Sequence, residues 1–292
     1  GKELELDKIM LLKQKELLNQ LTSNALRVIA FAYKNCDKIV EESMTFLGFV
    51  GMIDPPKKGT KEAIEQLKNA GIKTIMVTGD SIDTAFAIGK RLGIASSKED
   101  CIEGREFEQL RYYQKKEIIQ KKTIFARVSP KNKIDIVTSF QKEDNLVAMT
   151  GDGVNDAPSL RKADVGIAMG RKGTDVAKSA SDMILLDDNY SSIATSVKEG
   201  RGIYANIKKT TLFLLSSNFA EVLAMLLGVL LNLPMPLVPV HILWINLITD
   251  SLPAIALGVD KSSDEIMNEL PRKKNESLFA KGGYKILFGY GF

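Results

Sequence analysis

The chain has 292 residues, of which 45% are hydrophobic and 26% are charged, and 40 Lys and Arg residues against 36 Asp and Glu residues give a net charge of +4. These proportions are typical of globular proteins and exclude a disordered or collagen-like chain, and the length suits two domains better than one. The basic excess is spread along the chain in runs of mixed sign, which does not favour a nucleic-acid-binding protein.

The two ends of the chain differ in polarity. The first 200 residues are typical of a charged α/β protein, whereas residues 210–258 contain two acids, one histidine and no Lys or Arg, which predicts a membrane part. Cys36 and Cys101 lie far apart, which favours neither a disulfide framework nor a thiolate metal site. Because the sequence begins at Gly1 without an initiator Met or a signal peptide, we expect a piece of a longer protein.

From residue 45 to 188, short apolar runs alternate with amphipathic stretches, which is the pattern of βαβ units. Strands are predicted at 73–78, 123–127, 146–150, 164–168 and 183–186, and helices at 61–70, 82–92, 130–141, 155–163 and 173–180, with Gly71 and Gly93 as stops. Right-handed crossovers would make this α/β part a doubly wound parallel sheet. Active sites of such sheets lie beyond the carboxyl ends of the strands.

Two of these strand ends carry residues suited to phosphate chemistry. They are the turn Thr78-Gly79-Asp80 and the run Thr150-Gly151-Asp152-Gly153-Val154-Asn155-Asp156. The glycines permit tight turns that bring N–H groups close to an anion. Because Asp152 and Asp156 would repel a phosphate, their pairing predicts a Mg²⁺ ion beside it. A lone Thr-Gly-Asp turn is mostly structural, whereas the seven-residue run is much more specific.

Lys133 lies in the first turn of the helix predicted at 130–141, directly after a strand. The helix dipole makes that turn unfavourable for a cation, and a bound phosphoryl group would remove the penalty. A solvated lysine is the alternative. Arg105, in Gly104-Arg105-Glu106, is a weaker candidate because surface arginines are common.

Two apolar segments, 210–231 and 237–258, flank a short turn at 232–236. The first would be about 33 Å long as a helix, which is enough to cross a bilayer. Pro239 and Pro253 are expected to loosen the second span and free carbonyl groups as ligands. Basic residues flank the pair of spans on its outer sides: Arg201, Lys208, Lys209, Arg272, Lys273 and Lys274. They place both outer ends, and hence the α/β part, in the cytoplasm.

Each span carries oxygen-bearing side chains on one helical face. Asn218 and Glu221 are three residues apart, and Asn246, Thr249 and Asp250 are related by three and four. An acid at the centre of a membrane helix costs on the order of 2.5–3.5 kcal/mol on insertion scales, so two such patches favour a cation site. The alternative is hydrogen bonding between the helices.

Four residues at successive strand ends resemble, in order, the second to fourth motifs of the haloacid dehalogenase-like phosphotransferases: Thr78, Lys133, Asp152 and Asp156. The first motif of that family is a nucleophilic Asp after an early strand, which is Asp-Lys-Thr-Gly-Thr in the ATP-driven cation pumps. This motif is not found here. The Asp-Lys pairs at 7–8 and 260–261 lack the strand and the glycine turn that it requires.

Over nearly its whole length the chain resembles the P-type cation-transporting ATPases, specifically the calcium-pump branch of the type II pumps. The matching motifs follow the family order: Asp54-Pro55-Pro56, Met76 to Asp80, Ala126 to Pro130, Thr150 to Pro158, Ser216 to Asn218, and Trp244 to Pro253. The resemblance implies the end of a nucleotide-binding domain at 1–40 and a hinge with the phosphorylation domain at 41–190. A stalk with the fifth and sixth transmembrane helices would occupy 191–258, and a cytoplasmic loop with the start of a further transmembrane helix 259–292.

The resemblance also implies a role for each candidate residue. Asp152 would bind Mg²⁺, Lys133, Thr78 and Gly79 would contact the aspartyl phosphate, Asn155 and Asp156 would support the site, and Arg105 and Asp80 would lie near the phosphates of ATP. The implied ligands of transported Ca²⁺ are Asn218, Glu221, Asn246, Thr249 and Asp250. Ca²⁺ takes six to eight oxygen ligands, so further ones would come from helices that this chain lacks. Lys57 stands where the family commonly has Arg.

The implied protein is a pump that uses ATP to export Ca²⁺ from the cytoplasm through an aspartyl-phosphate intermediate. It would be a multi-pass protein of the plasma membrane, and the partners of this chain would be an actuator domain, the nucleotide domain and other transmembrane helices. Without the phosphorylated Asp, this chain is not expected to be active alone. The alternatives are a P-type pump for Na⁺, H⁺ or Mn²⁺, a membrane-tethered phosphatase of the same superfamily, and a nonenzymatic subunit with a decayed catalytic fold.

Overall fold

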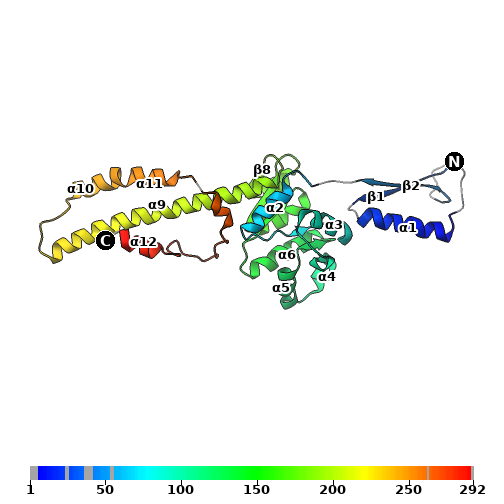
Figure 1. The fold of residues 1–292 in the computed structure, drawn as a ribbon, viewed down its shortest axis with the longest axis horizontal. Coiled ribbons are helices and arrows are strands. Elements are labelled where there is room, and N and C mark those ends of the chain that lie inside the picture. Colours follow the sequence, from blue (N-terminus) through cyan, green and yellow to red (C-terminus); the bar gives the residue numbers. More distant parts are fainter. Residues whose placement is uncertain (1–5, 24–25, 36–41, 53–55, 262, 291–292) are drawn as a thin grey trace. The chain divides into compact units, whose positions relative to one another are not determined.

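The computed structural model describes residues 6–23, 26–35, 42–52, 56–261 and 263–290. The chain forms two compact units, one of residues 1–68 and 73–192 and the other of residues 69–72 and 193–292 (Figure 1). Gly1, Cys36 and the Asp54-Pro55 part of the hinge motif, all named above, lie outside the described residues.

The first unit begins with helix α1 (Lys8–Ser23) and strands β1 (Arg27–Tyr33) and β2 (Thr45–Met52). The two strands pair antiparallel along their length, with an irregular register between Phe31 and Ala32. The sequence does not predict this pair, because the alternation that indicates βαβ units begins only at residue 45. The predicted domain boundary at residues 40 and 41 falls between these two paired strands and stays a prediction.

The rest of the first unit is the expected parallel α/β fold, but it contains two three-stranded sheets where one was predicted. The first sheet has the order β3-β5-β4, with β3 (Met76–Val77), β4 (Cys101–Glu103) and β5 (Ile124–Ala126) all parallel. The second has the order β6-β7-β8, with β6 (Ala148–Gly151), β7 (Val165–Met169) and β8 (Met183–Leu185) also parallel. Within the described residues, β3 and β4 are the edge strands of the first sheet and β6 and β8 those of the second.

Helices connect these strands in the βαβ manner that the sequence predicts. They are α2 (Thr60–Asn69), α3 (Ile82–Leu92), α4 (Gly104–Gln109), α5 (Tyr112–Lys121), α6 (Pro130–Lys142), α7 (Ala157–Lys162) and α8 (Asp175–Ser179), with short 3₁₀ turns η1 (Lys98–Asp100) and η2 (Val154–Asp156). Gly93 ends α3 with φ 76°, and its N–H donates to the carbonyl groups of Gly89 and Lys90, as the predicted stop requires. The predicted helix 155–163 begins as the 3₁₀ turn η2.

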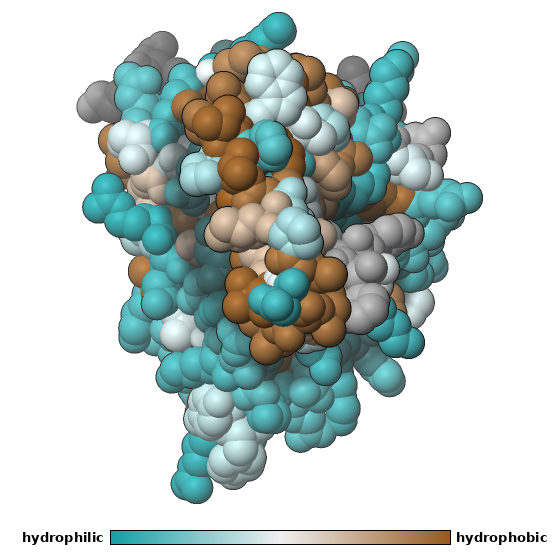
Figure 2. Space-filling model, turned by 90° about the vertical axis from the view of Figure 1, so that its left-hand side faces the viewer, coloured by the Kyte–Doolittle hydropathy of each residue, from teal (hydrophilic) through white to brown (hydrophobic). Residues whose placement is uncertain are grey.

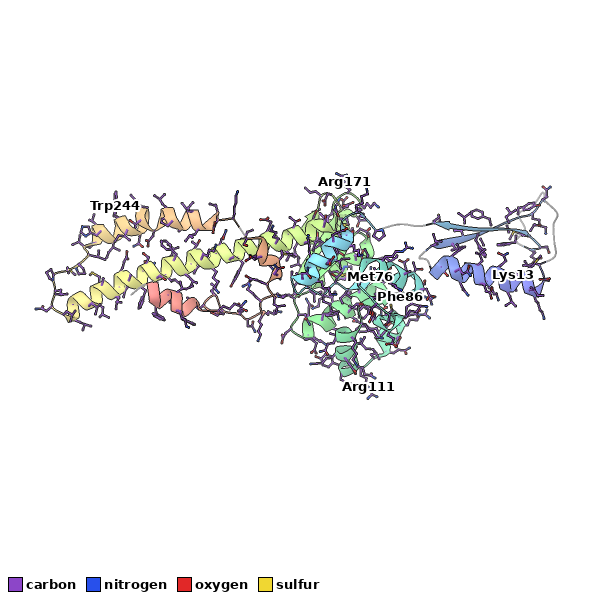
Figure 3. All side chains as sticks on the ribbon, viewed as in Figure 1. Lys13, Met76, Phe86, Arg111, Arg171 and Trp244 are labelled. Atoms are coloured by element: carbon purple, nitrogen blue, oxygen red, sulfur yellow. The ribbon has the colours of Figure 1, made fainter. Side chains whose placement is uncertain are left out.

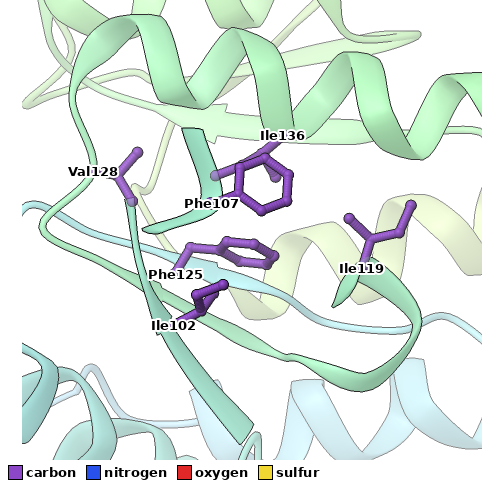
Figure 4. Close-up of a cluster of buried hydrophobic side chains, with 6 residues drawn as sticks. All are labelled: Ile102, Phe107, Ile119, Phe125, Val128 and Ile136. Atoms are coloured by element: carbon purple, nitrogen blue, oxygen red, sulfur yellow. The ribbon is translucent and has the colours of Figure 1, made fainter. Parts of the chain in front are cut away.

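The core beside the first sheet fixes the strand that leads to Lys133. It contains Ile102, Phe107, Ile119, Phe125, Val128 and Ile136 (Figure 4). The rings of Phe107 and Phe125 meet edge to face, with centroids 5.3 Å apart. Because these side chains come from α4, α5 and α6 as well as from the strands, their burial holds the start of α6 against the carboxyl end of β5.

The second unit consists of helices that follow the apolar pattern of the sequence. They are α9 (Ser191–Leu230), α10 (Pro239–Trp244), the π-helical turn η3 (Ile245–Thr249), α11 (Ser251–Gly258), the 3₁₀ helix η4 (Asp264–Asn268) and α12 (Gly283–Tyr290). Two stretches, 191–230 and 239–258, are long and apolar enough to cross a membrane. The first predicted span is thus the second half of one continuous helix.

α9 and the segment from α10 to α11 run antiparallel as a hairpin. The Thr210 hydroxyl donates to the Ala254 carbonyl (3.4 Å), and the Asn206 amide donates to the Asp260 carbonyl (2.7 Å). Apolar residues, coloured brown, are exposed on the face shown in Figure 2. Trp244 on α10, labelled in Figure 3, is 62% exposed. Pro239 is the first residue of α10, where its missing N–H costs nothing, so the expectation that it loosens the helix was wrong.

Candidate active site

The turn after β3 is held by the neighbouring strand of its sheet. Thr78 donates its N–H to the Phe125 carbonyl (2.9 Å), and the Thr78 and Asp80 carbonyl groups accept from the N–H groups of Val128 and Arg127. Within the turn, the Thr78 hydroxyl donates to the Asp80 carboxylate (2.8 Å). This bond leaves the Thr78 hydroxyl at the carboxyl edge of the sheet, where the sequence predicts a phosphate contact.

Lys133 is positioned by the cap of α6. Ser129 is the N-cap, with its hydroxyl accepting from the Asn132 N–H, and Pro130 occupies the first turn, where its fixed φ suits a helix start. The Asn132 side chain returns a bond by accepting from the Ser129 N–H (3.0 Å). Lys133 follows on the next position of the helix and is not a solvated lysine, because its side chain is 18% exposed.

The run after β6 folds around the carboxylate of Asp156. This carboxylate accepts from the N–H groups of Asp152 (3.2 Å) and Gly153 (3.1 Å) through one oxygen, and Lys133 donates to the other oxygen at 2.5 Å. A Cβ at Gly151 would lie 2.5 Å from the Asp156 Cβ, so only glycine fits there. Gly151, expected from the sequence to shape an anion-binding turn, thus makes room for a buried carboxylate.

The Lys133–Asp156 pair joins the two sheets of the first unit. Burial opposes ionisation of Asp156, but the Lys133 ammonium and the N–H groups of Gly153 and Asp152 outweigh it, so the pKa of this carboxyl lies below its ordinary value. Both Asp156 oxygens are therefore committed to the protein. Asp156 supports the loop, and of the predicted carboxylate pair only Asp152 is free to bind a cation.

Asp152 is exposed at the carboxyl end of β6, and its carbonyl accepts from the Thr174 N–H (2.8 Å). Thr174 ends the loop that follows β7, and the start of this loop is fixed by Asp188, whose carboxylate accepts from the N–H groups of Arg171 and Lys172 (both 2.9 Å). The Arg171 N–H is the main cause that lowers the pKa of Asp188. Lys57 donates to the Asp188 carbonyl at 2.5 Å. This contact needs only one donor, so it does not require the bidentate guanidinium of an Arg at this position.

The residues of the first unit can supply part of a Mg²⁺ site. No group of three or more His, Cys, Asp or Glu side chains able to hold a metal occurs within the described part of the chain. Mg²⁺ usually takes one or two protein carboxylates and completes its shell with water and substrate phosphates. Asp152 can supply one such carboxylate, and the remaining ligands would come from outside these residues.

Arg105 and Asn155 complete the sequence-predicted set in the first unit. Arg105 is exposed in the first turn of α4, after β4, on the same carboxyl edge as Thr78. Asn155 is exposed in the 3₁₀ turn η2. The structure gives neither side chain a hydrogen bond among the residues it describes, so both are free for a ligand and neither has a demonstrated role.

In the second unit, Asp250 is paired with Ser217, a residue of α9 that was not among the predicted ion ligands. Asp250 is 3% exposed, and one of its carboxylate oxygens accepts from the Ser217 hydroxyl (2.9 Å). The other Asp250 oxygen and one Glu221 oxygen are buried without a hydrogen-bond partner among the described residues. Because an unpaired buried carboxylate oxygen is costly, each of these two atoms is suited to accept a hydrogen bond or to bind a cation.

The other three predicted ion ligands are not gathered there. Asn218 and Asn246 are exposed, and their amide groups donate to the carbonyl groups of Leu214 and Ile242 on their own helices. Thr249 is exposed at the end of the π-helical turn. In that turn the Asp250 N–H donates to the Ile245 carbonyl (2.9 Å), so the helix is irregular just before the buried acid.

Sequence reasoning missed three residues that shape these sites: Ser217, Thr174 and Asp188. A signal existed for Ser217, which lies four residues before Glu221 on the same helical face. Thr174 acts through its backbone, and Asp188 acts on a loop 16 and 17 residues earlier in the chain. Neither contact has a sequence signature.

Comparison with known protein families agrees with this geometry. Residues 5–164 match the family described as haloacid dehalogenase-like hydrolase, and residues 234–292 match that described as cation transporting ATPase, C-terminus. The first match contains both sheet edges of the candidate site, and the second contains Asp250.

Curated relatives match over most of this chain. It is 51% identical over 271 residues to calcium-transporting ATPase 1 of Bacillus cereus, covering 91% of this chain and 30% of that protein. It is 45% identical over 279 residues to the calcium-transporting ATPase of Bacillus subtilis, covering 93% and 31%. It is 40% identical over 285 residues to calcium-transporting ATPase 1 of Yarrowia lipolytica, covering 95% of this chain and 31% of that protein. The chain thus spans about 30% of the length of these relatives.

Proposed function

Because this chain belongs to the haloacid dehalogenase-like hydrolases and its C-terminal part to the cation-transporting ATPases, we propose that it is the phosphorylation and membrane part of an ATP-driven Ca²⁺ pump. The whole protein would export Ca²⁺ from the cytoplasm through an aspartyl-phosphate intermediate. The similarity to calcium-transporting ATPases of 40–51% identity supports this proposal.

The observation that carries the proposal is the pair of buried, unpaired carboxylate oxygens on Glu221 and Asp250. They lie on two apolar helices, where a carboxylate without a partner is strongly disfavoured. A phosphatase merely tethered to a membrane has no use for them, whereas a hard cation such as Ca²⁺ would satisfy both. Asn218, Asn246 and Thr249 would turn toward the ion when it binds, together with ligands from other helices of the pump.

The first unit would supply electrostatic stabilisation for phosphoryl transfer. The γ-phosphoryl group of ATP would move to a carboxylate oxygen of an Asp outside this chain, and ADP would leave. The Thr78 hydroxyl, released from Asp80, and the Gly79 N–H would donate to phosphoryl oxygens, and the Lys133 ammonium would neutralise their charge. Asp152 would hold Mg²⁺, whose charge would offset the negative charge that develops on the phosphoryl oxygens. Asp80 and Arg105 would face the nucleotide.

The strand order supports an acceptor Asp supplied by a further strand. Both β3 and β6 pair on one side only within the described residues, and each is followed by a candidate phosphate loop. A parallel strand paired with both would join the two sheets into the single sheet that the sequence predicts. Its carboxyl end would then lie between Thr78 and Asp152, which is where a phosphorylated Asp is needed.

The proposed location is the plasma membrane, with the first unit in the cytoplasm. Basic residues outside both spans support this orientation by the positive-inside rule. The other parts of the pump, an actuator domain, the rest of a nucleotide domain and further transmembrane helices, would be its partners.

The test is ATPase activity of the full-length membrane protein as a function of free Ca²⁺, for wild type, Asp152→Asn and Asp250→Asn. We expect Ca²⁺ stimulation that both substitutions abolish, with phosphoenzyme formed from ATP lost in Asp250→Asn because the ion site gates phosphorylation. Phosphoenzyme formed at the same level with and without Ca²⁺ would contradict the calcium assignment.

A pump for Na⁺, H⁺ or Mn²⁺ is the second candidate. The oxygen chemistry of Glu221 and Asp250 favours it as well, since hard cations share these ligands. Stimulation by one of these ions in place of Ca²⁺, lost again in Asp250→Asn, would establish it.

A further inference from the structure

A cavity of about 360 Å³, lined by both charged and apolar residues, lies in the second unit beside α9. Its α9 wall consists of Val197, Gly200, Arg201, Tyr204, Ala205 and Lys208, whose spacing of three and four places them on one face of the helix. The opposite wall comes from the segment after α11, between Ile266 and Lys281. A cavity of this size lies within the range of ligand pockets.

The charges that line this cavity are mainly positive. Four basic side chains, Arg201, Lys208, Arg272 and Lys281, face two acids, Glu269 and Glu276. Arg201 is already committed, because its guanidinium donates to the carbonyl groups of Ile266, Glu269 and Ala70 at 2.7–2.9 Å. The other three basic groups retain donors for a ligand.

These three groups are arranged for an anion. The Arg272 guanidinium lies over the Tyr204 ring, 3.1 Å from its centroid, and has no carboxylate partner in the described part of the chain. This stacking fixes the planar donor fork without using its N–H groups. Lys281 contacts Glu276 only loosely, at 3.8 Å. Lys208 donates one hydrogen bond, to the Ala280 carbonyl, and an ammonium has two more to give.

The cavity lies at the level of the lipid headgroups if α9 crosses the membrane as proposed. Lys208 is two residues before Thr210, where the apolar segment begins, which is about 3 Å along a helix. Arg201 is about 13 Å from the same point. The headgroup region extends roughly 5–8 Å beyond the hydrocarbon core, so the Lys208 end of the cavity falls within it.

We propose that this cavity binds the phosphate group of an anionic phospholipid from the cytoplasmic leaflet. Arg272, Lys208 and Lys281 would contact the phosphate, and the apolar segment of α9 that begins at Thr210 would receive the acyl chains. Basic pockets beside transmembrane helices on the cytoplasmic side bind lipid headgroups of this kind. The proposal rests on the membrane placement of α9 and not on the transported ion or on phosphorylation.

The test is native mass spectrometry of the full-length protein, with phosphatidylglycerol titrated into phosphatidylcholine nanodiscs and the phosphatidylglycerol retained after release into mild detergent counted per protein. The double substitution Arg272→Gln with Lys281→Gln should weaken one phosphatidylglycerol site at least tenfold, at about fivefold for each basic residue removed. The matched control is Lys273→Gln with Lys274→Gln, which removes the same charge from residues that do not line the cavity. It should change the affinity less than twofold.

A second variant keeps every charge and fills the cavity. A Cβ at Gly200 would have no atom within 4 Å, so Gly200→Leu should fold and exclude the headgroup. Loss of the phosphatidylglycerol site in this variant supports the proposal. Equal losses in the two glutamine double variants would overturn it, because surface charge alone would then explain binding. Displacement of the lipid by millimolar inorganic phosphate would overturn it too, by making the site one for free phosphate.

Discussion

Replacing Asp156 by Asn should loosen the junction between the two sheets of the first unit. Lys133 donates to one carboxylate oxygen and two backbone N–H groups donate to the other, at 2.5–3.2 Å. An Asn side chain has one acceptor oxygen and one donor NH₂ group. The NH₂ group would therefore face either the Lys133 ammonium or the two backbone N–H groups, and in both cases donor would meet donor. The side chains are 18% and 10% exposed, so Lys133 would be left largely buried without a counter-charge.

The expected loss is about 2–4 kcal/mol. Breaking a fully buried ion pair by removing one partner costs about 3–5 kcal/mol, and the residual exposure of this pair lowers that figure through solvent screening. Hydrogen exchange of the chain in detergent, followed by mass spectrometry of peptides from 124–137 and 148–160, measures the loss as faster local opening. Asp175→Asn is the matched control, because that carboxylate is exposed and contacts Lys178 only at 4.0 Å.

The same pair gives a pH dependence with a defined sign. The pKa of Asp156 is depressed in the folded protein, so as pH falls the unfolded chain takes up the proton first. The stability difference between wild type and Asp156→Asn should be constant above the ordinary value of about 3.9 and shrink as pH falls through the lower folded value. A difference below about 0.5 kcal/mol at neutral pH, or equal exchange in Asp175→Asn, would refute the reasoning.

Three further predictions concern the loop and the membrane site. Gly151→Ala should destabilise the first unit by about 1–3 kcal/mol in denaturant unfolding, because its Cβ would meet the buried Asp156 side chain at 2.5 Å. Gly153→Ala should be tolerated, because its Cβ would have no atom closer than 3.6 Å. Equal effects of the two substitutions would contradict this account. Ser217→Ala should raise the Ca²⁺ concentration for half-maximal ATPase by about five- to tenfold, since Asp250 loses its hydroxyl donor, and an unchanged value would exclude that role. Asp188→Ala should speed hydrogen exchange at 170–174 severalfold, because two N–H groups lose their acceptor, and unchanged exchange would show that the loop is held by other contacts.

The sequence was sufficient for elements whose cause is local. The strand-to-helix units around Thr78, Lys133 and Asp152 follow from apolar runs, caps and glycine stops, and the structure has all three. The α/β class and the two apolar spans follow from the same periodicities. In each case the residues that decide the local structure lie within one turn or one strand of it.

The sequence was insufficient where the cause is a contact between distant segments. β1 and β2 pair although residues 34–44 separate them, and β4 joins its sheet by pairing with β5. The hydrophobic periodicity of one short window cannot indicate either pairing. The roles of the carboxylates divide for the same reason. Asp152 and Asp156 are identical residue types four positions apart, and only the fold shows that the Asp156 carboxylate is paired with Lys133.

This division of roles bears on how the first unit would respond to a phosphoryl group. Lys133 is held by Asp156 in this structure, yet the proposed reaction needs its ammonium near phosphoryl oxygens. An ammonium carries three donors, so Lys133 can keep the Asp156 bond and still donate to a phosphate beside it. Asp156 would then fix the direction of the ammonium, while exposed Asp152 stays available to a cation. The two carboxylates therefore suit different tasks. The fold buries Asp156 beside Lys133, where it can position the lysine, and leaves Asp152 exposed, where it can bind a metal.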